Sequence, residues 1–262
     1  MRLPRALLCL AATAAAALST TAFAYAAPAA VNYAAVGDSY AAGVGTQSSY
    51  DTSCDRSTKG YPSLWAAAHS VSAFTNLACT GAKTTDVISG QVGSLSSANT
   101  MVTVTIGGND AGFTSTMESC IVGGDSGCNT AVNKAKTFVA NTLPGLLDNT
   151  YNAVRSHAPN ATVYVVGYPR FYQLGGSCSV GLSDTARGYI NSGADALDGA
   201  ISAAASRHGF RFVDVRTAFT NHGICSSAVW LNSVTWPVVN SYHPNASGYA
   251  SGYLPALTAV TG

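Results

Sequence analysis

The stretch VNYAAVGDS, residues 31–39, joins a buried strand to the first side chain suited to chemistry. Residues 31–36 are apolar enough for a strand that is covered on both faces, and Gly37 ends the run. Ser39 follows two residues later. Ligands of open parallel sheets bind beyond the carboxyl ends of the strands. The stretch therefore predicts a parallel sheet with Ser39 at its ligand-binding edge.

Four further segments have the apolar composition of strands: residues 74–78, 101–106, 162–166 and 210–215. The run over 101–106 is the clearest, because it is rich in β-branched residues and is followed by Gly107 and Gly108. Five segments of this kind are enough for a sheet of ordinary size.

Helical segments separate the expected strands. Residues 61–69 look helical, and apolar residues keep helical spacing over 132–154, where Pro144 should kink or split the helix. Ser183 or Asp184 can cap a later helix. Alternating strands and helices predict an α/β fold: a three-layer α/β/α sandwich around a mostly parallel five-stranded sheet, with right-handed crossovers.

The N-terminus reads as a secretory signal peptide. Arg2 and Arg5 precede an apolar run over residues 6–18, and small residues follow at 22–26. The apolar run is shorter than the about 20 residues that a membrane-spanning helix needs. We expect a signal peptide over residues 1–28, cleaved between about residues 24 and 30, and a single secreted, soluble domain over 29–262.

Charged residues are sparse. The chain has 13 basic and 12 acidic residues, and loss of the two leader arginines brings the basic count to 11. Because nucleic-acid binding requires clustered positive charge, we expect no nucleic-acid partner. We expect the protein to be a monomer.

Six cysteines remain once Cys9 is removed with the leader, and an even number in an exported chain indicates disulfides. The sequence alone does not choose among the possible pairings, but pairing nearest neighbours closes the shortest loops. We therefore expect the disulfides Cys54–Cys79, Cys120–Cys128 and Cys178–Cys225. No C-x-x-C or H-E-x-x-H spacing indicates a metal site, and we expect neither a metal nor a cofactor.

Three later segments carry residues suited to nucleophilic catalysis. Gly81 and Asn109 follow the second and third expected strands, and His243 lies near the C-terminus. A serine hydroxyl needs a neighbouring base as it attacks, and histidine is the usual base. We expect Ser39 as nucleophile and His243 as base. The backbone N–H groups of Ser39 and Gly81 and the side-chain amide of Asn109 are the expected donors to an oxyanion.

Less specific interpretations exist for some of these residues. A lone Gly-Asp-Ser also fits a turn in which Asp38 or Ser39 caps a helix. We expect Asp38 to bind nearby backbone N–H groups and Asp110 to brace a loop, and we expect neither to take part in chemistry. The G-x-S-x-G signature of α/β-hydrolases is missing, because position 41 is alanine.

Four blocks of sequence together resemble the SGNH, or GDSL, hydrolase family. They are Gly37-Asp38-Ser39, Gly81, Gly107-Gly108-Asn109-Asp110 and His243-Pro244-Asn245. The resemblance runs from about residue 31 to the C-terminus. In residues 37–40, 106–113, 167–172 and 240–244 the chain more narrowly resembles the secreted actinomycete lipases and phospholipases A1 of that family. It implies a flavodoxin-like three-layer fold, three disulfides and no metal requirement.

Two positions depart from the family pattern. Many members carry a triad aspartate three residues before the histidine, where this chain has Asn240, which supplies no negative charge. In the similar secreted enzymes a backbone carbonyl two residues before the histidine orients the ring, which implies that role for Ser241. The family's leucine after the serine is Tyr40 here, which we expect to affect packing only.

We expect a secreted carboxylic ester hydrolase that cleaves acyl esters of lipids through a Ser-His dyad and an acyl-enzyme. It resembles a lipase or esterase and, more narrowly, a phospholipase A1, with transient contact to a lipid interface. Two alternatives stay open: a polysaccharide acetylesterase of the same family, and a carbohydrate- or lipid-binding domain without turnover.

Six aromatic residues lie in loops near the expected crevice. They either pack beneath long loops or form an apolar wall for an acyl chain, since burying each CH₂ group gains about 0.8 kcal/mol. They are Tyr168, Phe171, Tyr172, Trp230, Trp236 and Tyr242.

Overall fold

A sheet of five parallel strands, in the order β2-β1-β3-β4-β5, forms the centre of the computed structural model. The structure describes residues 30–178 and 181–262, so the expected signal peptide lies outside the described residues. The strands are β1 (Val31–Gly37), β2 (Val71–Asn76), β3 (Met101–Thr105), β4 (Thr162–Val166) and β5 (Arg211–Val213). This strand order is that of flavodoxin-like doubly wound sheets, as expected.

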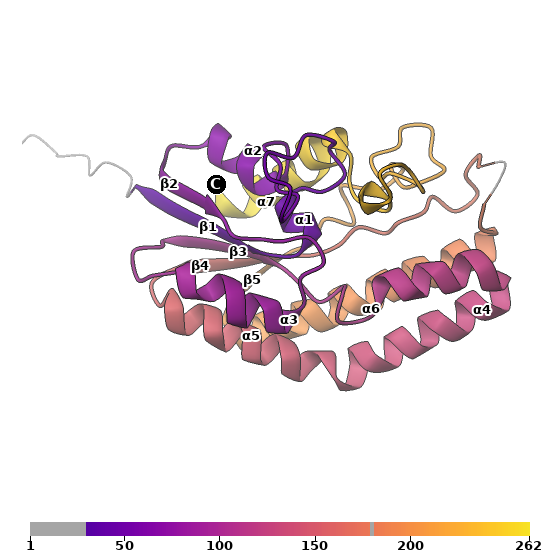
Figure 1. The fold of residues 1–262 in the computed structure, drawn as a ribbon, viewed down its shortest axis with the longest axis horizontal. Coiled ribbons are helices and arrows are strands. Elements are labelled where there is room, and N and C mark those ends of the chain that lie inside the picture. The colour runs from indigo at the N-terminus through magenta and orange to yellow at the C-terminus, as the bar shows by residue number, and fades with distance from the viewer. Residues whose placement is uncertain (1–29, 179–180) are drawn as a thin grey trace, which may run out of the picture.

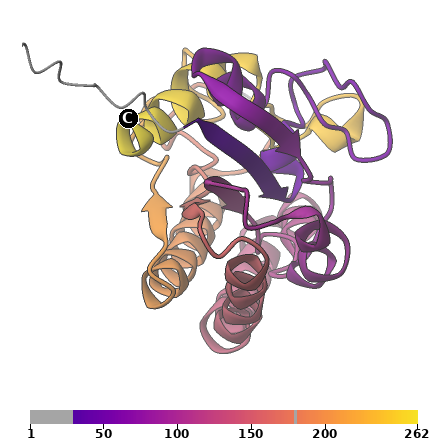
Figure 2. The ribbon, with the colours of Figure 1, turned by 90° about the vertical axis from the view of Figure 1, so that its left-hand side faces the viewer.

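Helices cover both faces of the sheet, which completes the expected three-layer sandwich (Figures 1 and 2). One face carries α2 (Tyr61–Ala68), the π-helical turn η4 (Gly248–Tyr253) and α7 (Leu254–Thr261). The other carries α3 (Thr84–Asp86), η1 (Val87–Gln91), η2 (Val92–Ser94), α4 (Phe113–Asn141), α5 (Leu143–His157) and α6 (Asp184–Arg207). The remaining short helices are α1 (Ser39–Ala42) and η3 (Val238–Asn240).

The two edge strands differ most from the sequence-based prediction. β2 begins at Val71 rather than at residue 74, because an edge strand needs few buried side chains and its first residues are largely exposed. It ends at Asn76, whose side-chain oxygen accepts a hydrogen bond from the Ala78 N–H (3.0 Å). β5 ends early at Val213, because the Asp214 carboxylate turns the chain by binding the N–H two residues on.

The helical region after β3 confirms one expectation and corrects another. Pro144 does split the expected helix, and it lies in the first turn of α5, where a missing N–H costs nothing. However, helical structure begins at Phe113, well before residue 132. Within α4 the chain reverses at Gly124, whose backbone is not helical. Figure 1 shows the two arms of α4 side by side at one end of the molecule.

Three disulfides hold the described chain, and they are the same three pairs that the sequence analysis expected. Cys120 and Cys128 flank the reversal of α4. Their Cα atoms are 3.9 Å apart, whereas the same separation along a straight helix would span about 12 Å. This bridge therefore fixes the turn in α4.

Buried tyrosines bond the core to the carboxyl ends of the strands. Tyr61 shares a hydrogen bond with the Thr105 hydroxyl at the end of β3 (2.9 Å). Tyr253 donates to the Gly167 carbonyl just after β4 (3.0 Å). Buried polar groups need such partners, so the hydroxyls fix the carboxyl ends of the strands, where the loops converge.

Every helix of the described residues is too short or too polar to cross a membrane.

Candidate active site

Ser39 lies just beyond the carboxyl end of β1, and its position depends on the glycine that ends this strand. Gly37 has a φ of +133°, and a Cβ there would come within 2.1 Å of the Thr105 carbonyl oxygen. Only glycine fits a backbone that approaches β3 so closely. Asp38 then donates its N–H to the same carbonyl (2.9 Å), and Ser39 begins α1. The serine hydroxyl is thereby directed beyond the end of the strand.

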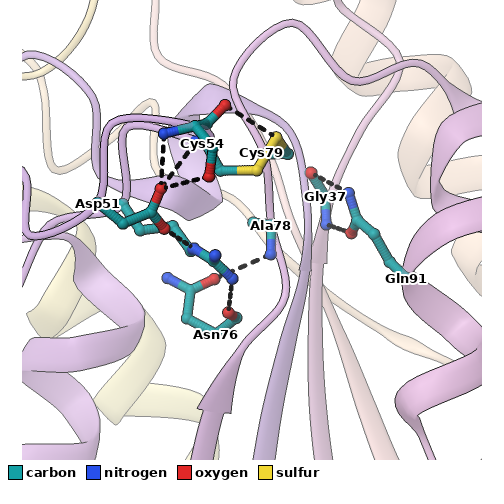
Figure 3. The surroundings of a disulfide bond; sticks show 9 residues. Gly37, Asp51, Cys54, Asn76, Ala78, Cys79 and Gln91 are labelled. Carbon is teal, nitrogen blue, oxygen red and sulfur yellow. Dashed lines mark hydrogen bonds and ion pairs between the residues drawn. A yellow bond between two sulfur atoms is a disulfide. The ribbon is translucent and has the colours of Figure 1, made fainter.

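Gln91 secures the same glycine from the opposite side (Figure 3). Its side chain accepts from the Gly37 N–H (2.7 Å) and donates to the Gly37 carbonyl (2.9 Å). That carbonyl also accepts from the N–H of Cys79, which is bonded to Cys54. The end of β1 is thus fixed to the loop that carries Gly81. Gln91 was not predicted as part of the site, because no local motif marks it.

The imidazole of His243 lies between the serine and a backbone carbonyl. Its Nε2 is 2.7 Å from Ser39 Oγ, and its Nδ1 is 2.9 Å from the Ser241 carbonyl oxygen. A carbonyl only accepts, so Nδ1 carries the proton and Nε2 is free to accept from the serine hydroxyl. Burial lowers the pKa of His243 from 6.5 to about 4, which keeps the ring neutral.

Tyr40 and Asn240 each make a polar contact that helps to hold the loop before His243. Tyr40 donates its hydroxyl to the Tyr242 carbonyl (2.6 Å), so the expectation that it affects packing only is wrong. The Asn240 side chain accepts from the Gly45 N–H (3.1 Å). Among the described residues, no hydrogen bond joins that side chain to His243. Asn240 therefore fastens two loops together and does not replace a triad aspartate.

The three expected oxyanion donors line one cavity with Ser39 and His243. The backbone N–H groups of Ser39 and Gly81 have no protein acceptor within the described part of the chain. Asn109 donates one amide hydrogen to the Ala82 carbonyl (2.9 Å), which leaves the other hydrogen available. Gly81 has a φ of +75° and open space where a Cβ would stand. The reason for glycine at this position is therefore its backbone conformation and not a lack of space for a side chain.

Asp38 links the serine loop to the asparagine loop. Its buried carboxylate accepts from the Tyr40 N–H (3.0 Å) and from the Tyr168 hydroxyl, and that hydroxyl accepts from the Gly108 N–H (3.2 Å). Burial raises the pKa of Asp38 to about 7, although these hydrogen bonds oppose the shift. The contact of Asp38 with a nearby backbone N–H was expected from the sequence, whereas its contact with the Tyr168 hydroxyl was not.

Asp110 braces a neighbouring loop, as expected. Its carboxylate accepts from the N–H and from the hydroxyl of Thr84, the first residue of α3. These contacts are 3.0 and 2.6 Å long. The carboxylate is therefore occupied away from Ser39.

The cavity has a volume of about 380 Å³ and extends between α4, α6 and the loop before His243. Most of its wall is apolar, including Phe113, Met117, Val132, Val139, Ile190 and Leu197. Of the six aromatic residues considered above, Tyr168, Phe171 and Tyr242 line this cavity. Trp230 instead stacks on His222, and Trp236 is exposed to solvent. Among the described residues, no group of His, Cys, Asp or Glu side chains is arranged to hold a metal ion.

Comparisons with known proteins agree with this geometry. A model of the GDSL-like Lipase/Acylhydrolase family matches residues 35–251. A lipase of Streptomyces rimosus is 51% identical over 235 residues, which cover 88% of this chain and 87% of that protein.

Two solved structures are similar throughout. The extracellular lipase from Streptomyces rimosus has a TM-score of 0.86 and 51% identity, with 88% of this chain and 100% of that chain covered. The phospholipase A1 from Streptomyces albidoflavus NA297 has a TM-score of 0.85 and 49% identity, with 88% and 99% covered.

Proposed function

The chain belongs to the GDSL-like lipase/acylhydrolase family and is a serine ester hydrolase, and from this premise we propose that it cleaves acyl esters of lipids with Ser39 as nucleophile and His243 as base. The observation that carries this assignment is the chain of short contacts from Ser39 Oγ through the imidazole to the Ser241 carbonyl. A hydroxyl, a neutral imidazole and an orienting acceptor are the parts that nucleophilic acyl transfer needs.

In the proposed mechanism, Ser39 Oγ attacks the ester carbonyl carbon while its proton passes to His243 Nε2. The Ser241 carbonyl holds the other ring nitrogen and stabilises the imidazolium that forms. The imidazolium then protonates the leaving alcohol as the carbon–oxygen ester bond breaks. A water molecule repeats these steps on the acyl-enzyme and releases the fatty acid.

The negative charge on the former carbonyl oxygen is met by three donors in this proposal. They are the N–H groups of Ser39 and Gly81 and the side-chain amide of Asn109. Losing one such donor typically costs about 10²- to 10³-fold in rate. The hydrogen bond from Asn109 to Ala82 supports this role, because it fixes the orientation of the amide.

The apolar cavity favours a lipid acyl chain over an acetyl group. A space of about 380 Å³ is far larger than an acetyl group fills, and each additional buried CH₂ gains about 0.8 kcal/mol. The similarity to the phospholipase A1 of Streptomyces albidoflavus supports glycerophospholipids as substrates besides neutral glycerides.

The proposal includes export of the protein as a single-domain monomer after removal of residues 1–28. The N-terminal pattern of a signal peptide, the three disulfides and the similarity to an extracellular lipase support it.

A substrate panel tests the proposed activity. Triacylglycerols, phosphatidylcholine and p-nitrophenyl esters of increasing chain length are offered to the protein, with Ser39→Ala as the blank. We expect hydrolysis of the long-chain esters. Activity confined to acetyl esters would favour the polysaccharide acetylesterase, and absence of labelling by a serine-directed organophosphonate would favour a binding domain without turnover.

A further inference from the structure

Large apolar side chains project into solvent from two segments of the chain. In the loop before His243, Val234 is 61% exposed, Trp236 82% and Val238 62%. At the turn of α4, Ile121 is 53% exposed and Val122 is 85% exposed. We name these five residues the apolar rim. A contiguous exposed apolar surface usually marks an interaction site.

The rim is continuous with the catalytic cavity. Val234, Val238 and Ile121 are exposed to solvent and at the same time line the cavity that contains Ser39. In Figure 1 the loop that carries Trp236 lies at the same end of the molecule as the turn of α4. A substrate that enters the cavity therefore passes the rim.

The C-terminal part of the chain is almost free of charge. After Arg216 it contains no Lys, Arg, Asp or Glu, and this part includes the whole loop from Val229 to His243. Besides the buried Asp38, the charged residues that line the cavity are Glu118 and Lys136, which belong to α4 and have opposite signs. Anionic lipids attract basic protein surfaces, so a surface without net positive charge gains no electrostatic attraction to them.

We propose that the apolar rim docks on the surface of aggregated neutral or zwitterionic lipid, with Trp236 as its main anchor. Tryptophan suits this position, because its ring combines a large apolar body with a polar N–H and is enriched at membrane–water interfaces. An acyl chain then passes from the lipid phase into the cavity without crossing water. This inference rests on the proposed lipid hydrolysis and adds the surface through which lipid is reached.

Binding and turnover are measured separately. Phosphatidylcholine vesicles are sedimented with protein in the Ser39→Ala background, which removes turnover. We expect Trp236→Ala to lower the vesicle partition coefficient by about tenfold, the value of one buried large side chain. Val122→Ser should lower it less, and Trp236→Phe should retain most of the binding. Tyr50→Ala is the matched control, since Tyr50 is an aromatic residue that is 54% exposed and lies outside the rim and the cavity lining.

With Ser39 present, Trp236→Ala should slow hydrolysis of vesicle phosphatidylcholine. It should leave kcat/KM on a soluble short-chain p-nitrophenyl ester within about twofold, because Trp236 does not line the cavity. The proposal is overturned if Trp236→Ala binds vesicles as well as Tyr50→Ala does, or if binding requires anionic lipid and is lost in salt. It is also overturned if Trp236→Ala abolishes a dimer and leaves vesicle binding unchanged. Failure to hydrolyse any ester would instead reject the proposed function.

Discussion

At the scale of single residues, the proposed reaction of Ser39 depends on an imidazole that stays neutral. Burial of the His243 ring disfavours its charged form, and this desolvation lowers its pKa to about 4. The usual aspartate partner would raise that pKa, whereas the Ser241 carbonyl orients the ring with a partial charge only. The dyad is therefore suited to act as a base over a wide range of pH.

This lowered pKa makes a prediction about pH. A group whose pKa is depressed remains deprotonated until the pH falls through the depressed value, so the active form of His243 should persist below pH 6.5. We expect the acid limb of kcat/KM on a soluble ester to lie nearer pH 4 than pH 6.5. Asp38→Asn provides the control, because Asp38, whose pKa is raised to about 7, is the buried carboxyl that precedes Ser39. An acid limb at pH 6.5 or above in both proteins would contradict the prediction.

Asn240 provides a second test at this scale. Its side chain binds the Gly45 N–H and not His243, so Asn240→Ala should keep most of the turnover number. The variant leaves a backbone donor unpaired, and we expect a loss of about 1–3 kcal/mol in the free energy of unfolding. Turnover of Asn240→Ala and His243→Ala is compared on the same ester. Equal collapse in both would make the Asn240 side chain a required member of the site.

At the scale of secondary-structure elements, the end of β1 is fixed by groups that lie far away in sequence. Gln91, in η1, makes two hydrogen bonds to Gly37 and is 54 positions distant. The Cys54–Cys79 bridge and the Cys79 N–H hold the adjoining loop. These contacts determine how the Ser39 and Gly81 N–H groups are presented to an ester.

We predict that Gln91→Ala lowers kcat/KM while the dyad remains intact. The change leaves the buried Gly37 N–H unpaired, which typically costs about 1–3 kcal/mol, and it frees the segment before Ser39. The measurement combines steady-state kinetics with denaturant unfolding. Gln173→Ala is the control, because that side chain makes only an exposed contact to its neighbour. Unchanged kinetics for Gln91→Ala would show that the other contacts position Gly37.

The disulfides allow a comparison between two elements. Replacing Cys54 and Cys79 by serine loosens the loop that leads to Gly81, whereas replacing Cys120 and Cys128 loosens the turn of α4. Each loss should cost about 2–5 kcal/mol of stability. We expect the first variant alone to show a lower kcat on a soluble ester, measured well below both melting temperatures. An equal effect of both variants on kcat would contradict this division.

At the scale of the whole molecule, a parallel sheet brings the site together. Ser39 and His243 are 204 positions apart, yet the loops that follow successive strands open at the same edge. The cavity and the apolar rim adjoin, because Ile121, Val234 and Val238 belong to both. One edge of the sheet therefore serves both the chemistry and the proposed contact with lipid.

The central strands and the candidate reacting groups could be predicted from the amino-acid sequence alone. The strand over 101–106 was predicted because buried parallel strands need continuous apolar runs. Short local patterns around the candidate site residues led to the choice of Ser39, Gly81, Asn109 and His243. The edge strand β2 was misplaced, since exposed residues obey no such requirement.

The contacts that hold those groups in place depend on the packing of the whole chain and could not be predicted from local sequence. The partners of Gln91 and of the Tyr168 hydroxyl lie 54 to 130 positions away, and no local pattern encodes a hydrogen bond over such a distance. Trp236 was expected either to pack beneath a loop or to form part of an apolar wall, and the fold leaves it exposed to solvent. Local patterns indicate which groups are suited to react. Burial and the pairing of distant polar atoms, in contrast, depend on how the whole chain packs.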